Sequence, residues 1–167
     1  MDGNTLLGIA REVIARVPMC FAITVDRNGE ANARIVQPSA LADEWTVRFM
    51  TDRRSRKVEE IERSGRMTLA YQDDPRGAYV TLVGRAKIIG DVAVKEAIWK
   101  PASFKWHPGG PTDPNVVLIE FFTDRIELWS SPHGVTPDPA KGLWAAFLVR
   151  EAAGWRHGTT GRHSMAD

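Results

Sequence analysis

The chain has 167 residues, a formal net charge of +1 and one cysteine. This length predicts a single domain, residues 1–167, whose core needs no metal or disulfide. The near-zero net charge argues against a general nucleic-acid-binding protein, because such proteins neutralise many phosphates with a basic face. Cys20 alone can form no internal disulfide, and no signal-peptide or membrane-spanning pattern is seen. We therefore expect a cytoplasmic protein that binds neither nucleic acid nor membrane.

The chain begins with a predicted helix within 1–17, where apolar residues recur at helical spacing and Asn4 or Thr5 can act as the N-cap. Asn28-Gly29, between two alternating stretches, predicts the turn of a β-hairpin. Gly84, inside a long alternating stretch, predicts a bulge or a sharp bend. Alternation of apolar residues predicts strands at 19–26, 30–38, 45–51, 66–73 and 78–91, and two more within 115–131.

Short helices are expected at 55–64, ended by Gly65, and at 92–99. Residues 143–158 predict a last pair of strands, although their alanines also allow a helix. The polar tail, 159–167, is expected to fray. Antiparallel strands with short helices between them predict a mainly β protein, a β-barrel with peripheral helices, and closure of that barrel would leave no exposed sheet edge.

The stretch TDRRSRKVEEI, residues 51–61, places cations at a helix N-terminus, where unpaired backbone N–H groups already concentrate positive potential. Each such cation costs about 0.3–1 kcal/mol at an exposed site. The hydroxyl of Ser55, the first-turn N–H groups, and the side chains of Arg56 and Lys57 can converge on one phosphate-sized anion. A solvated basic loop relieved by nearby glutamates, or a patch for RNA binding or targeting, is the alternative.

Four stretches of the chain, between Ala33 and Trp129, resemble the FMN-binding split barrel family related to pyridoxamine 5'-phosphate oxidase, general stress protein branch. They are ARIVQP, FMTDRRSRKVEEI, YVTLVGRAKIIGD and IWKPASFKWHPGGPTDPNVVLIEFFTDRIELW. The resemblance implies an antiparallel split β-barrel that binds FMN without a covalent link. It also implies a homodimer with the cofactor at the subunit interface, and an oxidoreductase of unassigned small-molecule substrate.

The resemblance assigns these residues to the cofactor: Arg34, Ile35, Val36, Met50, Thr51, Ser55, Arg56, Lys57, Tyr79 and Trp129. The first five would border the isoalloxazine ring and ribityl chain, and the next three would hold the phosphate. Trp129 matches an aromatic residue that the partner subunit provides, although a core tryptophan fits its position equally well. Tyr79 and Trp106 are candidates for the substrate side.

Three departures from the family pattern weaken vitamin B6 chemistry. Ser39 stands where pyridoxamine phosphate oxidases proper carry a lysine, and Tyr79 stands where they carry a glutamine. Their closing Arg-Leu-x-Pro is also missing. A non-catalytic flavin-binding stress protein, or a deazaflavin- or haem-binding member of the same fold, remains the alternative. No residue is identified as catalytic, and no metal is expected, because zinc-ligand spacing is absent around His107, His133, His157 and His163.

Overall fold

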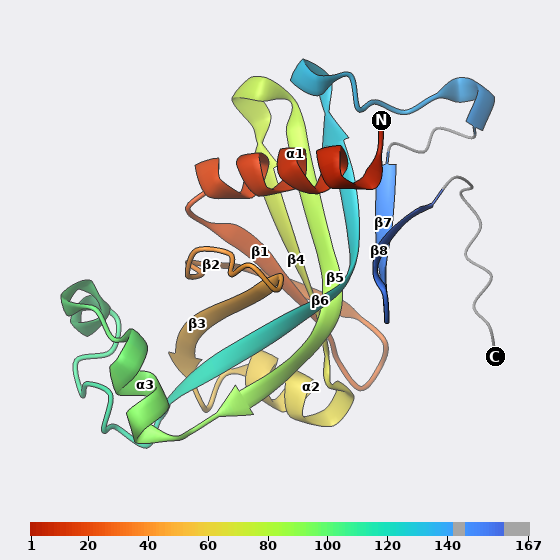
Figure 1. The fold of residues 1–167 in the computed structure, drawn as a ribbon. Coiled ribbons are helices and arrows are strands. Elements are labelled where there is room, and N and C mark those ends of the chain that lie inside the picture. Colours follow the sequence, from red (N-terminus) through yellow and green to blue (C-terminus); the bar gives the residue numbers. More distant parts are fainter. Residues whose placement is uncertain (142–145, 159–167) are drawn as a thin grey trace.

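The computed structural model describes residues 1–141 and 146–158. Figure 1 shows a curved sheet with α1 across its upper part and α2 against its lower end. The helices are α1 (Gly3–Arg16), α2 (Arg56–Ser64) and α3 (Val92–Ile98). The strands are β1 (Cys20–Val25), β2 (Ala31–Val36), β3 (Thr46–Asp52), β4 (Arg66–Asp73), β5 (Ala78–Ile89), β6 (Val116–Ser130), β7 (Ala146–Glu151) and β8 (Gly154–Gly158). Short 3₁₀ turns lie at Asp74–Arg76, Pro101–Lys105, Ser131–His133 and Pro139–Lys141.

The strands form one antiparallel sheet in the order β2-β1-β4-β5-β6-β7-β8, and β3 pairs with β6. β6 is long enough to pair with β3 along its first half and with β7 along its second half. Among the described residues, β2 pairs only with β1, so the ladder does not continue from β2 to β3. The predicted split β-barrel is confirmed, but the expectation that every sheet edge is closed is wrong.

α1 packs its apolar side against β4, β5, β6 and β8, across the upper part of the sheet (Figure 1). Ala10 and Val13 are buried there, on the side of the helix that faces the sheet. The N-cap is Asp2, whose carboxylate accepts the Thr5 N–H at 2.8 Å, and not Asn4 or Thr5 as expected. A carboxylate at this position also pairs with the positive end of the helix, which explains the earlier start.

The β1–β2 hairpin turns at Asn28-Gly29, as predicted. Gly29 has φ +85°, a conformation that glycine adopts without steric cost. The Asp26 carboxylate accepts the N–H groups of Asn28 at 2.8 Å and Glu30 at 2.9 Å. These bonds hold the hairpin tip in one shape beside α2.

The pairing of β5 with β6 shifts register between Val83 and Gly84, which confirms the predicted bulge. A Cβ atom on Gly84 would lie 2.0 Å from the Phe122 carbonyl oxygen. Only glycine therefore allows the two backbones to approach this closely. The bulge bends the two longest strands together and curves the sheet.

β6 is one continuous strand through Thr123 and Asp124, where two separate strands were expected within 115–131. The Thr123 hydroxyl donates to the Trp45 carbonyl oxygen at 2.8 Å. The Asp124 carboxylate lies 3.0 Å from the Arg85 guanidinium on the neighbouring strand. Because both polar side chains find partners across the strands, the segment stays extended, and the predicted break is wrong.

The C-terminal strand pair is present as β7 and β8, so the alanines there do not form a helix. Part of the predicted pair, 143–145, lies outside the described residues, as do the predicted tail, 159–167, and His163 within it. None of the helices in 1–141 or 146–158 is long and apolar enough to cross a membrane.

Candidate functional site

β3 leads through a tight turn into α2, and Ser55 is the N-cap of this helix. The Ser55 N–H donates to the Asp52 carbonyl at 3.1 Å. An N-cap hydroxyl usually accepts an N–H from the first helical turn, but the Ser55 hydroxyl makes no such bond. Its oxygen is buried and has no hydrogen-bond partner. A buried polar atom is thus left unsatisfied at the helix end where backbone N–H groups also lack intrahelical acceptors.

Two cations around this helix end have carboxylate partners. Arg53 Nη1 lies 3.6 Å from Glu62 Oε1, and Arg54 Nη2 lies 2.6 Å from Asp52 Oδ2. Hydrogen bonds from Arg54 lower the pKa of the Asp52 carboxyl to about 2. These pairs are largely exposed and add little stability, but they neutralise the charge of both arginines.

Arg56 and Lys57, by contrast, have no carboxylate within ion-pair distance in the described part of the chain. Partial burial lowers the pKa of Lys57, and the charge of Arg34 lowers it further, while Asp52 opposes both effects. A partly buried cation beside another cation is stabilised by an anion bound between them. The structure therefore leaves an uncompensated positive charge next to the unsatisfied Ser55 hydroxyl.

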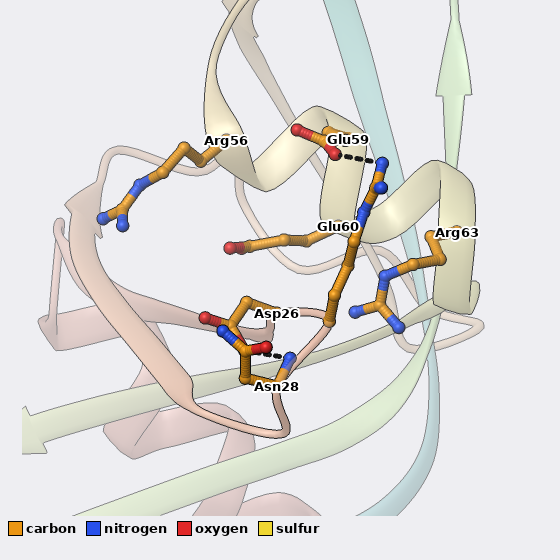
Figure 2. A pocket seen from close by; sticks show the side chains of 7 residues that line it. Asp26, Asn28, Arg56, Glu59, Glu60 and Arg63 are labelled. Carbon is orange, nitrogen blue, oxygen red and sulfur yellow. Dashed lines mark hydrogen bonds and ion pairs between the residues drawn. The ribbon is translucent and has the colours of Figure 1, made fainter.

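One side of α2 and the β1–β2 turn line a pocket of about 240 Å³, whose lining residues do not include Ser55 or Lys57 (Figure 2). The lining residues are Asp26, Arg27, Asn28, Arg56, Glu59, Glu60 and Arg63. Arg27 and Glu59 form an ion pair of 2.7 Å across it. Figure 2 shows Arg56 extending from the first turn of α2, apart from that pair. The pocket is polar and carries both signs of charge, so it suits a polar group better than an apolar substrate.

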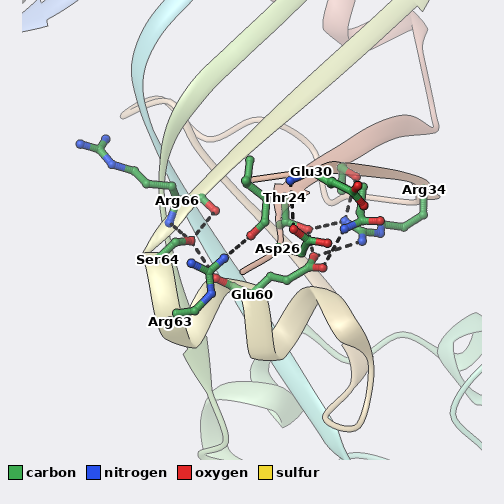
Figure 3. Close-up of polar contacts among 11 residues, drawn as sticks. Thr24, Asp26, Glu30, Arg34, Glu60, Arg63, Ser64 and Arg66 are labelled. Atoms are coloured by element: carbon green, nitrogen blue, oxygen red, sulfur yellow. Dashed lines mark hydrogen bonds and ion pairs between the residues drawn. The ribbon is translucent and has the colours of Figure 1, made fainter. Parts of the chain in front are cut away.

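On the barrel side of α2, the Glu60 carboxylate joins the helix to β1 and β2 (Figure 3). Glu60 Oε2 accepts a hydrogen bond from the Thr24 hydroxyl, and Oε1 accepts one from Asn32 Nδ2 at 3.0 Å. Arg34 Nη2 lies 3.3 Å from Glu60 Oε2, and Arg34 Nη1 donates to Thr24 Oγ1 at 2.5 Å. The network turns Arg34 toward α2 and fixes β2 against the candidate phosphate site.

Sequence reasoning missed the roles of Glu60 and Thr24, and counted Glu60 only among the glutamates that could relieve a solvated basic loop. The structure leaves Glu60 only 5% exposed. A signal was available, because Glu60 lies between Val58 and Ile61, which are both buried on the core side of α2. Thr24 likewise occupies an inward position of the alternating strand β1.

The other residues predicted for the ring and ribityl chain differ in their exposure. Ile35 is 50% exposed on the outer face of β2, whereas Val36 belongs to the buried core. On β3, Met50 is half-buried and Thr51 is buried. The half-exposed Ile35 leaves this part of β2 open to solvent within one chain.

Tyr79 and Trp129 lie far from the α2 end within one chain. They are register partners on β5 and β6, and their rings meet edge to face with centroids 6.2 Å apart. Tyr79 pairs with Gln72 near the end of β4, whereas α2 leads into the start of β4 at Arg66. Six residues of strand separate Tyr79 from this C-terminal end of α2 by roughly 20 Å. Figure 1 shows the β4–β5 turn and α2 at opposite ends of the sheet. The structure therefore does not bring Tyr79 and Trp129 together with Ser55 in one subunit.

The His, Cys, Asp and Glu side chains of the described residues form no group of three or more that could hold a metal ion. His107 lies near Asp52 and Lys57, and burial lowers its pKa. His133 Nδ1 is hydrogen-bonded to the buried Ser130 hydroxyl at 2.7 Å. The N-terminus of α2 thus brings together a hydroxyl, Ser55, and two cations, Arg56 and Lys57, which are groups that can bind an anion.

Comparison with known proteins connects this arrangement with a family. The family model described as "Pyridoxamine 5'-phosphate oxidase like" matches residues 9–146. General stress protein 26 of Bacillus subtilis is 32% identical over 92 residues, which are 53% of this chain and 65% of that protein. The match therefore spans slightly less than two thirds of the length of this relative.

Solved structures show the same fold. A protein related to general stress protein 26 from Clostridium acetobutylicum has a TM-score of 0.68 at 22% identity, over 78% of this chain and 92% of that one. General stress protein 26 from Bacillus anthracis has a TM-score of 0.62 at 25% identity, over 72% and 91%. A pyridoxamine 5'-phosphate oxidase-related, FMN binding protein from Nostoc punctiforme has a TM-score of 0.65 at 14% identity, over 95% and 94%. Because the family model covers most of its length, this chain belongs to the pyridoxamine 5'-phosphate oxidase-like family.

Proposed function

We propose that the protein binds FMN and holds its phosphate at the N-terminus of α2. One observation carries this proposal: the buried, unpartnered Ser55 hydroxyl stands at a helix end whose adjacent cations, Arg56 and Lys57, lack carboxylate partners. Hydroxyl, helix N–H and cationic donors together are the set that binds a phosphate. The residues present thus fit the phosphate end of FMN.

We further propose that the protein is an oxidoreductase, because flavin when bound supplies transfer of a hydride or of electrons. The residues of the chain would bind and orient the cofactor. Ser55, Arg56 and Lys57 would hold the phosphate, while Ile35 and Thr51 would border the rest of the cofactor. The Glu60 network keeps β2 in place beside them. The FMN binding protein among the similar structures supports the choice of cofactor.

A homodimer with FMN at the subunit interface is part of the proposal. The outer face of the sheet exposes Phe21, Val25, Ile35 and Trp129. Phe21 and Ile35 are direct register partners, so their side chains form one apolar surface across β1 and β2. Exposed apolar surface of this kind marks an interface, and a second copy would bring its own Trp129 to a site that one chain leaves open. The single buried cysteine fits work in a reducing compartment, the cytoplasm.

The test compares Lys57→Glu with Arg53→Glu in an FMN titration followed by flavin fluorescence. Both variants change the net charge equally, but only Lys57 lacks a carboxylate partner. Lys57→Glu should abolish binding, because it sets a negative charge against a doubly anionic phosphate, and Arg53→Glu should bind nearly as the wild type. Equal FMN affinity of Lys57→Glu and wild type would refute the phosphate site. Reduction of bound FMN by NADH or NADPH would then separate an oxidoreductase from a passive flavin carrier.

A further inference from the structure

Lys95 is the residue that α3 buries, although its side chain carries a charge. The residue is only 1% exposed. Its ammonium group donates to the Val116 carbonyl at 2.8 Å and to the Asp113 carbonyl at 3.1 Å. In the part of the chain that the structure describes, no carboxylate pairs with it. Lys95 is therefore a buried cation whose partners are backbone carbonyls.

Burial of an ammonium group away from any carboxylate costs free energy, because the charge loses its water. An apolar side chain of similar length would fill the same space without this cost. The two hydrogen bonds offset part of the cost, and they also fix the positions of the two carbonyl oxygens, which an apolar contact does not do. Lys95 thus holds residues 113–116, at the start of β6, in a defined shape.

Residues 113–116 form a turn that is further closed by its own hydrogen bonds. The Asp113 carbonyl also accepts the Val116 N–H at 3.1 Å, and the Asp113 carboxylate accepts the Asn115 N–H at 2.8 Å. Figure 1 shows α3 at the lower end of the sheet, beside the start of β6. Lys95 therefore joins α3 to a turn that is already well ordered.

This turn contacts the segment that leads from β3 into α2. Val116 is the register partner of Asp52, the last residue of β3. The Asn115 carbonyl accepts the Arg53 N–H at 2.8 Å, and the Asp52 carbonyl accepts the Ser55 N–H at 3.1 Å. A chain of hydrogen bonds thus connects the Lys95 ammonium group, through backbone groups, with the N-cap of α2.

We propose that Lys95 is a positioning residue for the phosphate site, and that it sets the preference of the protein for FMN over riboflavin. It holds the turn 113–116, which in turn fixes the segment 52–55 so that the donors of the α2 N-terminus converge on one phosphate. The inference rests on the proposed function. Riboflavin lacks the phosphate, so the preference between the two flavins reports on this site.

Titrations with FMN and with riboflavin, followed by flavin fluorescence, compare the wild type with Lys95→Met and Lys105→Met. Lys105 is exposed between α3 and β6, so both variants lose one positive charge from the same segment. Lys95→Met should weaken FMN binding about tenfold and leave riboflavin binding unchanged, because only the phosphate contacts are disturbed. Lys105→Met should change neither affinity. A general loss of folded protein would reduce the binding of both flavins.

The dependence of FMN affinity on KCl separates positioning from direct contact. A cation that touches the phosphate makes binding sensitive to salt, because salt screens the attraction between the two charges. Lys57→Met should therefore flatten this dependence. Lys95→Met should keep the wild-type dependence, because Lys95 acts through the turn and not on the phosphate itself.

Hydrogen exchange of the wild type tests the same link if Lys95→Met does not fold. FMN should slow exchange of the Val116 N–H and of the Lys95 N–H, which donates to the Asp91 carbonyl at 3.2 Å, because coupling between two places is reciprocal. The Gly77 N–H, at the opposite end of the sheet, is the control and should not change.

Four results would overturn this inference: wild-type FMN affinity in Lys95→Met, an equal loss of FMN and riboflavin affinity, a flattened salt dependence, or unchanged exchange at Val116 and Lys95. If the wild type binds no FMN, the proposed function fails as well. The two failures are distinguishable, because the wild-type titration alone decides the second.

Discussion

Glu60 and Arg34 form an ion pair with 3.3 Å between Oε2 and Nη2, in which the carboxylate is almost fully buried and the guanidinium is 21% exposed. The pair joins α2 to β2. Glu60 offsets part of the Arg34 charge, and the remainder still lowers the pKa of Lys57. We therefore expect a phosphate at the N-terminus of α2 to be held mainly by Arg56 and Lys57.

Glu60→Gln tests this relationship. The amide keeps the shape of the side chain but leaves the Arg34 charge uncompensated, so we expect a loss of about 1–3 kcal/mol in the free energy of unfolding. The freed charge should at the same time strengthen binding of FMN. Urea unfolding and an FMN titration measure the two effects. The matched control is Glu59→Gln on the exposed side of the same helix, which should change stability by less than about 0.5 kcal/mol. Equal stability of the two variants would show that the buried pair has no structural role.

Gly84→Ala should destabilise the barrel. The new Cβ would lie 2.0 Å from a backbone oxygen of β6, which can move only if the β5–β6 pairing shifts, so we expect a loss of at least about 2 kcal/mol. Gly8→Ala is the control, because nothing lies within 4 Å of its Cβ position on α1. It should instead stabilise the protein by about 0.5–1 kcal/mol. Thermal unfolding of both variants measures these changes in stability. A Gly84→Ala variant as stable as the wild type would contradict the close approach of the β5 and β6 backbones at this position.

Stability should fall at alkaline pH because of Cys20. Burial raises the pKa of its thiol from 9.0 to about 11. Below 9.0 the thiol is neutral in both states. As pH rises from 9.0 to about 11, the unfolded chain releases this proton first, and native stability falls by up to about 2 kcal/mol. The free energy of unfolding, measured with urea at several pH values across this range, should fall less steeply with pH for Cys20→Ala than for the wild type. If the two free energies fall with pH at the same rate, Cys20 ionises equally in the folded and unfolded states.

Trp129→Ala should weaken both the dimer and FMN binding, because Trp129 is 43% exposed on the apolar sheet face and rests on Tyr79. Analytical ultracentrifugation and flavin fluorescence report the two properties. Trp106→Ala is the control: this ring is more exposed but lies outside the sheet, next to Lys105. If both variants keep the wild-type dimer and FMN affinity, Trp129 has no role at the interface.

Local patterns were sufficient to predict most elements of the fold. Alternation, the Asn28-Gly29 turn and the stop at Gly65 each depend on neighbouring residues, and the structure has all three. The continuity of β6 could not be predicted, because the partners of Thr123 and Asp124 come from segments distant in sequence. The same applies to Arg34, whose burial against Glu60 depends on how α2 packs.

The candidate site, like the fold, could be predicted only where it depends on residues that are neighbours in the sequence. Ser55, Arg56 and Lys57 lie together because they are consecutive at a helix start. The sequence could not show which cations of this stretch have carboxylate partners. Arg53 pairs with Glu62 and Arg54 with Asp52 because of the positions that the fold gives these side chains. Arg56 and Lys57 are left without such a partner among the described residues. The roles assigned to Tyr79 and Trp129 stay predictions.

The pairing of β3 with β6 joins residues 46–52 to residues 116–122, with the whole β4–β5 hairpin and α3 between them. Closing so long a loop costs chain entropy that local hairpins do not, so this contact should be among the last to form during folding. Because Thr51 lies in β3 and the turn to Ser55 follows directly from that strand, the proposed anion site would be completed in that late step. A partly folded chain made of hairpins alone would therefore have no cofactor site, and FMN would select the completed barrel.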